Sequence, residues 1–172
     1  MIPFDLSLIK ACCFDVDGVL SRTTVPTGPD GMPCRTANIK DGYAIQLAEK
    51  VGLRIAIISG ARIPSIRARY ITLGVTDIFL GAAVKVDTLE EFCSRHSLEP
   101  SSLLYMGDDI PDYDVMRRCG LPCCPSDAAP EIKAISTYIS PYKGGEGCVR
   151  DVLVHVLRAK GLWMNGPAAL AW

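Results

Sequence analysis

Residues 11–20 read Ala-Cys-Cys-Phe-Asp-Val-Asp-Gly-Val-Leu, and their pattern indicates a buried strand that ends at two carboxylates. The apolar run at its start has no polar alternation, which is typical of a strand buried on both faces of a parallel sheet. Asp15 and Asp17 then follow two residues apart. Ligands of open α/β sheets bind in the crevice at the carboxyl ends of the strands. This segment therefore predicts both a class of fold and the location of a site.

Similar runs recur along the chain. We expect strands at residues 11–16, 53–59, 77–80, 103–106, 121–124 and 138–140. Helical patterns lie between these runs: residues 44–51 place apolar side chains on one face before Gly52, and Pro64 and Pro111 fit first helical turns. Residues 151–160 are expected to form the last helix. The alternation predicts an α/β fold with a doubly wound, mainly parallel sheet.

Length and composition limit the class of protein. The chain has 172 residues, 49% of them hydrophobic, with 18 basic and 19 acidic side chains and a net charge of -1. This favours one folded domain over residues 1–172 and argues against disorder and against non-specific nucleic-acid binding. No apolar run approaches the roughly 18 residues of a membrane span, and we read no signal peptide, so a cytoplasmic location is expected.

Eight cysteines suggest a disulfide scaffold at first sight. However, residues 12–13 and 123–124 are adjacent pairs within apolar runs, where cysteine behaves as a small hydrophobic residue. Without a secretory signal, reduced thiols are the better interpretation. The remaining cysteine and histidine spacings do not match a structural zinc site.

Two segments depart from the alternating pattern. Residues 20–39 are rich in proline and glycine, which favours a projecting β-hairpin, with a mobile loop as the alternative. Residues 161–172 are short and apolar and hold both tryptophans, Trp163 and Trp172. We expect this tail to pack against another apolar surface, and a neighbouring subunit is one candidate.

A second acidic cluster follows the predicted strand at residues 103–106. It contains Asp108, Asp109 and Asp112. Hard oxygen ligands from two strand ends are what Mg²⁺ accepts, whereas the alternative is that these residues only begin a helix at Pro111. The presence of the first acidic pair favours a metal site over a simple helix start, because both clusters are expected at the same edge of the sheet.

Two further strand ends provide groups that suit phosphate. Ser59 and Gly60 end one predicted strand and offer a hydroxyl and backbone donors, and Lys85 lies past another and offers a point charge. Each signal is weak alone. Their order along the chain is specific: an Asp-x-Asp pair, then a serine, then a lysine, then an Asp-Asp pair, each after a strand.

On these motifs the chain resembles the haloacid dehalogenase superfamily of phosphatases. It resembles most closely the 3-deoxy-D-manno-octulosonate 8-phosphate phosphatases, a capless, tetrameric branch. The shared segments are residues 15–20, 40–43, 59–60, Lys85, 107–112 and 144–150. The spacing agrees with a capless chain, since only 41 residues separate Asp17 from Ser59 and 25 separate Ser59 from Lys85. Independent domains rarely fall below about 50 residues.

The resemblance implies a mechanism. Asp15 is the expected nucleophile and forms an aspartyl-phosphate, while Asp17 is the expected general acid and base. Mg²⁺ is expected on Asp15, the Asp17 carbonyl and Asp108. Ser59, Gly60 and Lys85 would bind the phosphoryl group, and Asp109 and Asp112 would orient Lys85 or metal-bound water.

Substrate recognition is expected to need cations, because the sugar acid is anionic. The resemblance favours Arg69 for the carboxylate, within its own chain or across a subunit boundary, and Arg62 is a second candidate. An ordinary solvated helix face is the alternative. Related phosphatases for nine-carbon sugar acids tend to carry an acidic residue after the Ser-Gly pair. This chain has Ala61 there, which favours the eight-carbon substrate of lipopolysaccharide synthesis.

Two other classes of protein are alternatives. A receiver domain of signalling proteins is also α/β and is phosphorylated on aspartate, but its acidic pair comes first and its phosphoacceptor later. Asp17, two residues after the expected nucleophile, suits rapid dephosphorylation instead. A non-catalytic assembly module is the other class, although all the expected catalytic residues are present.

Overall fold

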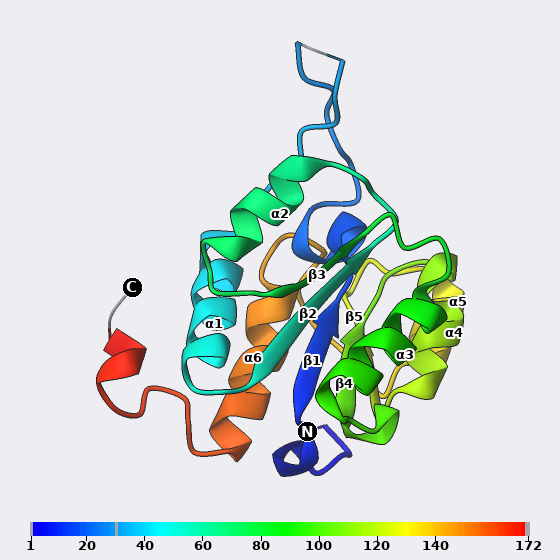
Figure 1. Ribbon diagram of the computed structural model, residues 1–172. Coiled ribbons are helices and arrows are strands. Elements are labelled where there is room, and N and C mark those ends of the chain that lie inside the picture. Colours follow the sequence, from blue (N-terminus) through cyan, green and yellow to red (C-terminus); the bar gives the residue numbers. More distant parts are fainter. Residues whose placement is uncertain (1, 30, 171–172) are drawn as a thin grey trace.

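The computed structural model describes residues 2–29 and 31–170, which form one six-stranded, all-parallel sheet with helices on both faces (Figure 1). The strands lie in the order β3-β2-β1-β4-β5-β6. Their bounds are β1 (Ala11–Phe14), β2 (Arg54–Ser59), β3 (Asp77–Leu80), β4 (Leu103–Met106), β5 (Leu121–Cys124) and β6 (Tyr138–Ile139). The helices are α1 (Ile39–Lys50), α2 (Pro64–Ile71), α3 (Lys85–His96), α4 (Tyr113–Arg118), α5 (Pro130–Ile135) and α6 (Cys148–Ala159). The predicted doubly wound α/β fold is confirmed.

The central position of β1 explains its continuous apolar run. All four of its residues are fully buried. Cys12 and Phe14 face the core formed with α1, α2 and α6, whereas Ala11 and Cys13 face the core formed with α3, α4 and α5 (Figure 1). A strand that alternates between two cores needs apolar side chains at every position.

Several predicted boundaries differ from those observed. The first strand ends at Phe14 instead of residue 16, because the Asp15 side chain accepts a hydrogen bond from Val16 N and begins a kinked turn, Val16–Leu20. The last helix begins at Cys148, three residues before the predicted start. Residues 110–112 form a short 3₁₀ turn that holds Pro111 in its first turn, and α4 follows directly at Tyr113.

The segment of residues 21–29 and 31–38 projects from the body of the protein, as expected (Figure 1). However, it has one isolated antiparallel bridge, Thr27 with Pro33, and no assigned pair of strands within its described residues. Hydrogen bonds from Gly28 N to Met32 O and from Cys34 N to Pro26 O hold its two sides together. Its prolines provide no N–H group, which limits the length of any ladder.

The described part of the C-terminal tail packs on its own chain. The Tyr43 hydroxyl of α1 donates a hydrogen bond to Ala169 O, and the rings of Tyr43 and Trp163 meet edge to face with centroids 6.0 Å apart. Trp172 lies outside the described residues. None of the helices within residues 2–29 and 31–170 has the length and apolar character needed to cross a membrane.

Candidate active site

The two acidic clusters meet where the strand order reverses. β1 pairs with β2 on one side and with β4 on the other, so Asp15 after β1 and Asp108 after β4 emerge at the same edge of the sheet. This is the topological switch point, where open α/β sheets form a crevice. A cavity of about 1010 Å³ lies there, lined by Asp15, Asp17, Ser59, Lys85 and Asp108 among others.

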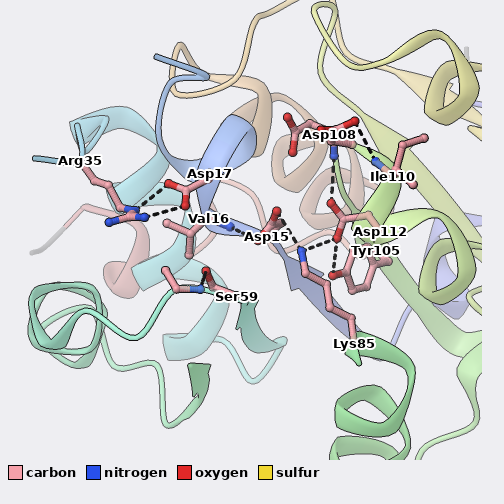
Figure 2. Close-up of polar contacts among 12 residues, drawn as sticks. Asp15, Val16, Asp17, Arg35, Ser59, Lys85, Tyr105, Asp108, Ile110 and Asp112 are labelled. Carbon is pink, nitrogen blue, oxygen red and sulfur yellow. Dashed lines mark hydrogen bonds and ion pairs between the residues drawn. The ribbon is translucent and has the colours of Figure 1, made fainter. Parts of the chain in front are cut away.

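Asp15 is held by two contacts and is 7% exposed. Its Oδ1 accepts a hydrogen bond of 2.7 Å from Val16 N, and its Oδ2 lies 3.0 Å from Lys85 Nζ (Figure 2). Burial and the nearby Asp112 raise the pKa of Asp15 well above its ordinary value, although Lys85 opposes the change. The carboxylate therefore lacks enough positive charge around it in the protein alone.

Lys85 is the first residue of α3 and bridges two carboxylates. Its Nζ donates to Asp112 Oδ1 at 2.7 Å, and the Tyr105 hydroxyl donates to the same oxygen at 2.9 Å (Figure 2). Burial alone would lower the pKa of Lys85, but Asp15 and Asp112 outweigh it and the pKa is raised. Lys85 is thus held in its charged form beside Asp15.

Three carboxylates of the site can share a cation. Asp15, Asp108 and Asp112 each offer an oxygen within 4.8 Å of the others. Burial and the neighbours Asp112 and Asp109 raise the pKa of Asp108 to about 7. Three hard oxygen donors against one lysine fit a divalent cation such as Mg²⁺, which would offset their repulsion.

Two glycines allow these carboxylates to come close. Gly18 has φ 82°, and a Cβ there would lie 1.9 Å from Asp108 Oδ2. A Cβ on Gly107 would lie 2.4 Å from the Cβ of Asp112. A larger residue at Gly18 would therefore push Asp108 away from the first acidic cluster, and one at Gly107 would displace Asp112.

Ser59 and Gly60 lie at the carboxyl end of β2 and line the same cavity. Ser59 is 1% exposed, and its Oγ accepts a hydrogen bond of 3.2 Å from Ala61 N. The hydroxyl proton of Ser59 therefore remains available to donate to a ligand oxygen.

Asp17 has a partner that the sequence analysis missed. Arg35, from the projecting segment, donates from Nε to Asp17 Oδ1 at 2.6 Å and from Nη2 to Asp17 Oδ2 at 2.7 Å (Figure 2). The Arg35 side chain is 14% exposed and lines the cavity. No local pattern links the two residues, since they lie 18 positions apart and the intervening loop decides their contact.

The structure separates other predicted site residues from this cluster. Asp109 lines the cavity, but its Oδ1 accepts from Ile110 N and caps the turn there. Arg62 and Arg69 are not among the residues that line the cavity in the described part of the chain. Arg62 lies against Gly81, and Arg69 lies against Gly42 of α1, where an added Cβ would meet Nη2 at 2.8 Å.

The segments 40–43 and 144–150 join helices behind the site. Asp41 Oδ1 accepts a hydrogen bond of 2.6 Å from Arg150 N in the first turn of α6. The Arg150 guanidinium lies over the rings of Tyr43 and Trp163, at 5.4 and 4.9 Å from their centroids. These contacts connect α1, α6 and the C-terminal tail.

Comparison with known proteins agrees with the geometry. Residues 65–152 match the family model described as haloacid dehalogenase-like hydrolase. The chain is 33% identical over 153 residues to the 3-deoxy-D-manno-octulosonate 8-phosphate phosphatase KdsC of Escherichia coli (strain K12), covering 89% of this chain and 81% of that protein.

Two solved structures of such phosphatases are similar over most of their length. The enzyme from Yersinia pestis superimposes with a TM-score of 0.88 at 32% identity and covers 92% of this chain and 85% of its own. The enzyme from Moraxella catarrhalis, in complex with magnesium ion, phosphate ion and the KDO molecule, gives 0.87 at 29% identity, with 91% and 90% covered. The strand order, the paired acidic clusters and these similarities together show that the chain belongs to the haloacid dehalogenase-like hydrolases, in the family of 3-deoxy-D-manno-octulosonate 8-phosphate phosphatases.

Proposed function

We propose that this protein is a Mg²⁺-dependent phosphatase that hydrolyses 3-deoxy-D-manno-octulosonate 8-phosphate to the free sugar acid and phosphate, for lipopolysaccharide synthesis. The observation that carries the proposal is the cluster at the switch point. There Asp15, Lys85 and Asp112 are joined by contacts of 2.7 and 3.0 Å beside a cavity of about 1010 Å³. Family membership supports the class of substrate.

In the first step, Asp15 Oδ attacks phosphorus, a new P–O bond forms, and the ester P–O bond to the sugar breaks. Lys85 and the Ser59 hydroxyl bind the phosphoryl oxygens, and their fixed positions lower the cost of orienting the group. Asp112 acts through Lys85, because its Oδ1 holds Nζ at 2.7 Å.

Asp17 carries the proton in both steps. It protonates the departing sugar oxygen and then takes a proton from the water that attacks the aspartyl-phosphate. That attack breaks the Asp15–phosphorus linkage and returns the carboxylate. Splitting the hydrolysis in two makes each displacement easier.

Asp15, Asp108 and the main-chain carbonyl of Asp17 would hold the Mg²⁺. When bound, the ion supplies charge neutralisation to the phosphoryl oxygens and to the crowded carboxylates. The proximity of the Asp15, Asp108 and Asp112 oxygens, within 4.8 Å, supports this assignment. Asp109 lies next to this set and would orient a water of the site.

The length of the sugar acid is the finer part of the proposal. Ala61 lines the cavity next to Gly60 and leaves no acidic group at that position. We assign the eight-carbon substrate on this basis, with the nine-carbon 2-keto-3-deoxynononate 9-phosphate as the alternative.

The chain is proposed to be a single capless domain that assembles as a homotetramer in the cytoplasm. The cavity is open to solvent in a single chain, so a neighbour would be needed to close it, and Arg62 or Arg69 of that neighbour would contact the substrate. Buried free thiols such as Cys12 and Cys123 support a reducing compartment. Sedimentation velocity tests the assembly, and a monomeric active enzyme would contradict it.

Phosphate release in the presence and absence of Mg²⁺ tests the function. Three substrates are needed: the eight-carbon sugar-acid phosphate, its nine-carbon analogue and an aryl phosphate such as p-nitrophenyl phosphate. We expect Mg²⁺-dependent release with a preference for the first. Preference for the second would keep the mechanism and change the substrate, and release from none would support an assembly module.

A further inference from the structure

We propose that Arg35 binds the carboxylate of the substrate and, by doing so, releases Asp17 for proton transfer. This inference rests on the proposed function, because it assumes an anionic sugar-acid substrate and the acid-base role of Asp17. It assigns to a residue of the same chain a contact that the sequence analysis expected from Arg62 or Arg69.

The first argument is the state of Asp17. Both of its oxygens accept hydrogen bonds from one guanidinium, at 2.6 and 2.7 Å. In Figure 2 the Asp17 carboxylate is turned towards Arg35, whereas the Asp15 carboxylate is turned towards Lys85. Both carboxylate oxygens are engaged by the guanidinium, so neither is placed to contact a leaving group in the cavity. The pair is therefore a resting arrangement that has to open before catalysis.

The second argument is the unused edge of Arg35. A guanidinium presents two edges that each match a carboxylate, one formed by Nε and Nη2 and the other by Nη1 and Nη2. Asp17 occupies the first edge. Nη1, on the second edge, is buried and has no hydrogen-bond partner among the described residues. A second carboxylate is the group that fits this edge. Because both edges include Nη2, this carboxylate would compete with Asp17 for the guanidinium.

The third argument is position. Arg35 and Lys85 are the cationic side chains among the residues that line the cavity in the described part of the chain. Lys85 is already held between Asp15 and Asp112, at 3.0 and 2.7 Å. Arg35 therefore remains as the cation for the second anionic group of a substrate whose phosphate lies at Asp15. Because Arg35 comes from the projecting segment, it can shift without disturbing the sheet.

The coupling makes a prediction about specificity. Breaking the Asp17–Arg35 pair costs free energy. The carboxylate of a sugar-acid substrate offsets this cost by binding Arg35 in place of Asp17, whereas an aryl phosphate has no group that can do so. We therefore expect the wild-type enzyme to favour the sugar-acid phosphate over p-nitrophenyl phosphate in part through Arg35.

The test compares both substrates in Arg35→Gln and in the wild type, with Mg²⁺ present. In the variant, KM for the sugar-acid phosphate should rise about 10- to 100-fold, which is the range for losing a hydrogen-bonded charge. The kcat for p-nitrophenyl phosphate should rise, because Asp17 is no longer held. Arg22→Gln is the matched control: it removes a guanidinium from the base of the same segment, where Arg22 pairs with Glu146 at 3.5 Å. Arg22→Gln should leave KM and kcat for both substrates unchanged.

Other outcomes overturn the inference. An equal loss on both substrates would make Arg35 only a support for Asp17, and unchanged kinetics would remove it from recognition. Arg35→Lys is the second variant in case the glutamine protein fails to fold. Lysine offers a point charge without a second edge, so the sugar-acid preference should fall below the wild-type value, and a full preference would contradict the proposal. A wild-type enzyme that shows no preference for the sugar-acid phosphate would instead overturn the proposed function itself.

Discussion

Asp15 follows β1 at the carboxyl end of the sheet, whereas Asp77 begins β3 at the amino end. Both carboxylates are buried, with 7% and 3% exposed. Asp77 has two arginines beside it, Arg54 at 3.5 Å and Arg95 at 3.3 Å, and the His96 ring lies 3.0 Å away. Asp15 shares a single lysine with Asp112 and faces Asp108 as well.

The difference in charge balance separates two kinds of buried carboxylate. Around Asp77 the protein supplies the positive charge itself, and the cluster connects β2, β3 and α3. Around Asp15 the carboxylates outnumber the cations, and burial together with this excess of negative charge raises the pKa values of Asp15 and Asp108. A site that is short of positive charge is suited to take up a metal ion.

The largest effect should come from Asp15→Asn, which removes the nucleophile. We expect turnover to fall at least about 10⁴-fold, as for other nucleophiles that act within a catalytic group. Stability should not fall, because the change removes one of several crowded negative charges. Phosphate release from the Mg²⁺-loaded variant and its thermal melting curve measure both. Wild-type turnover would refute the nucleophile assignment.

Lys85→Met changes the charge of the site in the opposite direction, because it removes a positive charge instead of a negative one. Without the lysine, Asp15 and Asp112 remain buried with no cation beside them. We expect the free energy of unfolding to fall by about 3–5 kcal/mol without Mg²⁺, as when one partner of a buried ion pair is removed. Added Mg²⁺ should restore part of the loss, because it binds only the folded site. Urea unfolding with and without the ion is the measurement, and equal stability of variant and wild type would argue against a buried bridge.

Asp41 is an intermediate case, with one oxygen bonded to the start of α6 and Oδ2 without a partner among the described residues. Burial raises the pKa of Asp41 to about 6 from 3.8. The folded state thus binds a proton more tightly than the unfolded state, so this contribution to stability is full below about pH 4 and is lost as the pH rises through 6.

The difference in unfolding free energy between wild type and Asp41→Asn should therefore decrease by up to about 3 kcal/mol from pH 4 to pH 7. Urea unfolding at several pH values gives this difference. Asp41→Ala, which also removes the acceptor for Arg150 N, should cost about 1 kcal/mol more than the asparagine variant. A difference that is independent of pH would mean that Asp41 is charged throughout this range.

The smallest effect is expected from Asp77→Asn. Arg54 and Arg95 are about half exposed and can return to water, so we expect a loss of about 1–3 kcal/mol and unchanged kcat/KM. Glu90→Gln is its control, because the exposed pair of Glu90 with Arg118 should contribute less than about 0.5 kcal/mol. Loss of activity in Asp77→Asn, with the fold intact, would contradict the separation of the two clusters.

Much of the fold was predictable because its signals are local. The apolar runs located every strand to within two residues at each end, and Gly52 and Pro64 marked helix boundaries. The boundaries that shifted did so where a side chain interrupts the pattern, as Asp15 does by capping Val16 N. The projecting segment was expected from its proline and glycine content, but its scant backbone pairing depends on how the two sides meet.

The sequence by itself determined which residues stand at the carboxyl ends of strands, and this was enough to bring Asp15, Ser59, Lys85 and Asp108 to one cavity. In a parallel sheet, all strand ends of one kind share an edge, so chain order becomes proximity. Only the tertiary structure decided which cation meets which anion. The path of a loop, and not a repeat or a motif, places Arg35 on Asp17 and turns Arg62 and Arg69 elsewhere. Such contacts join distant residues through side-chain geometry, which no local pattern encodes.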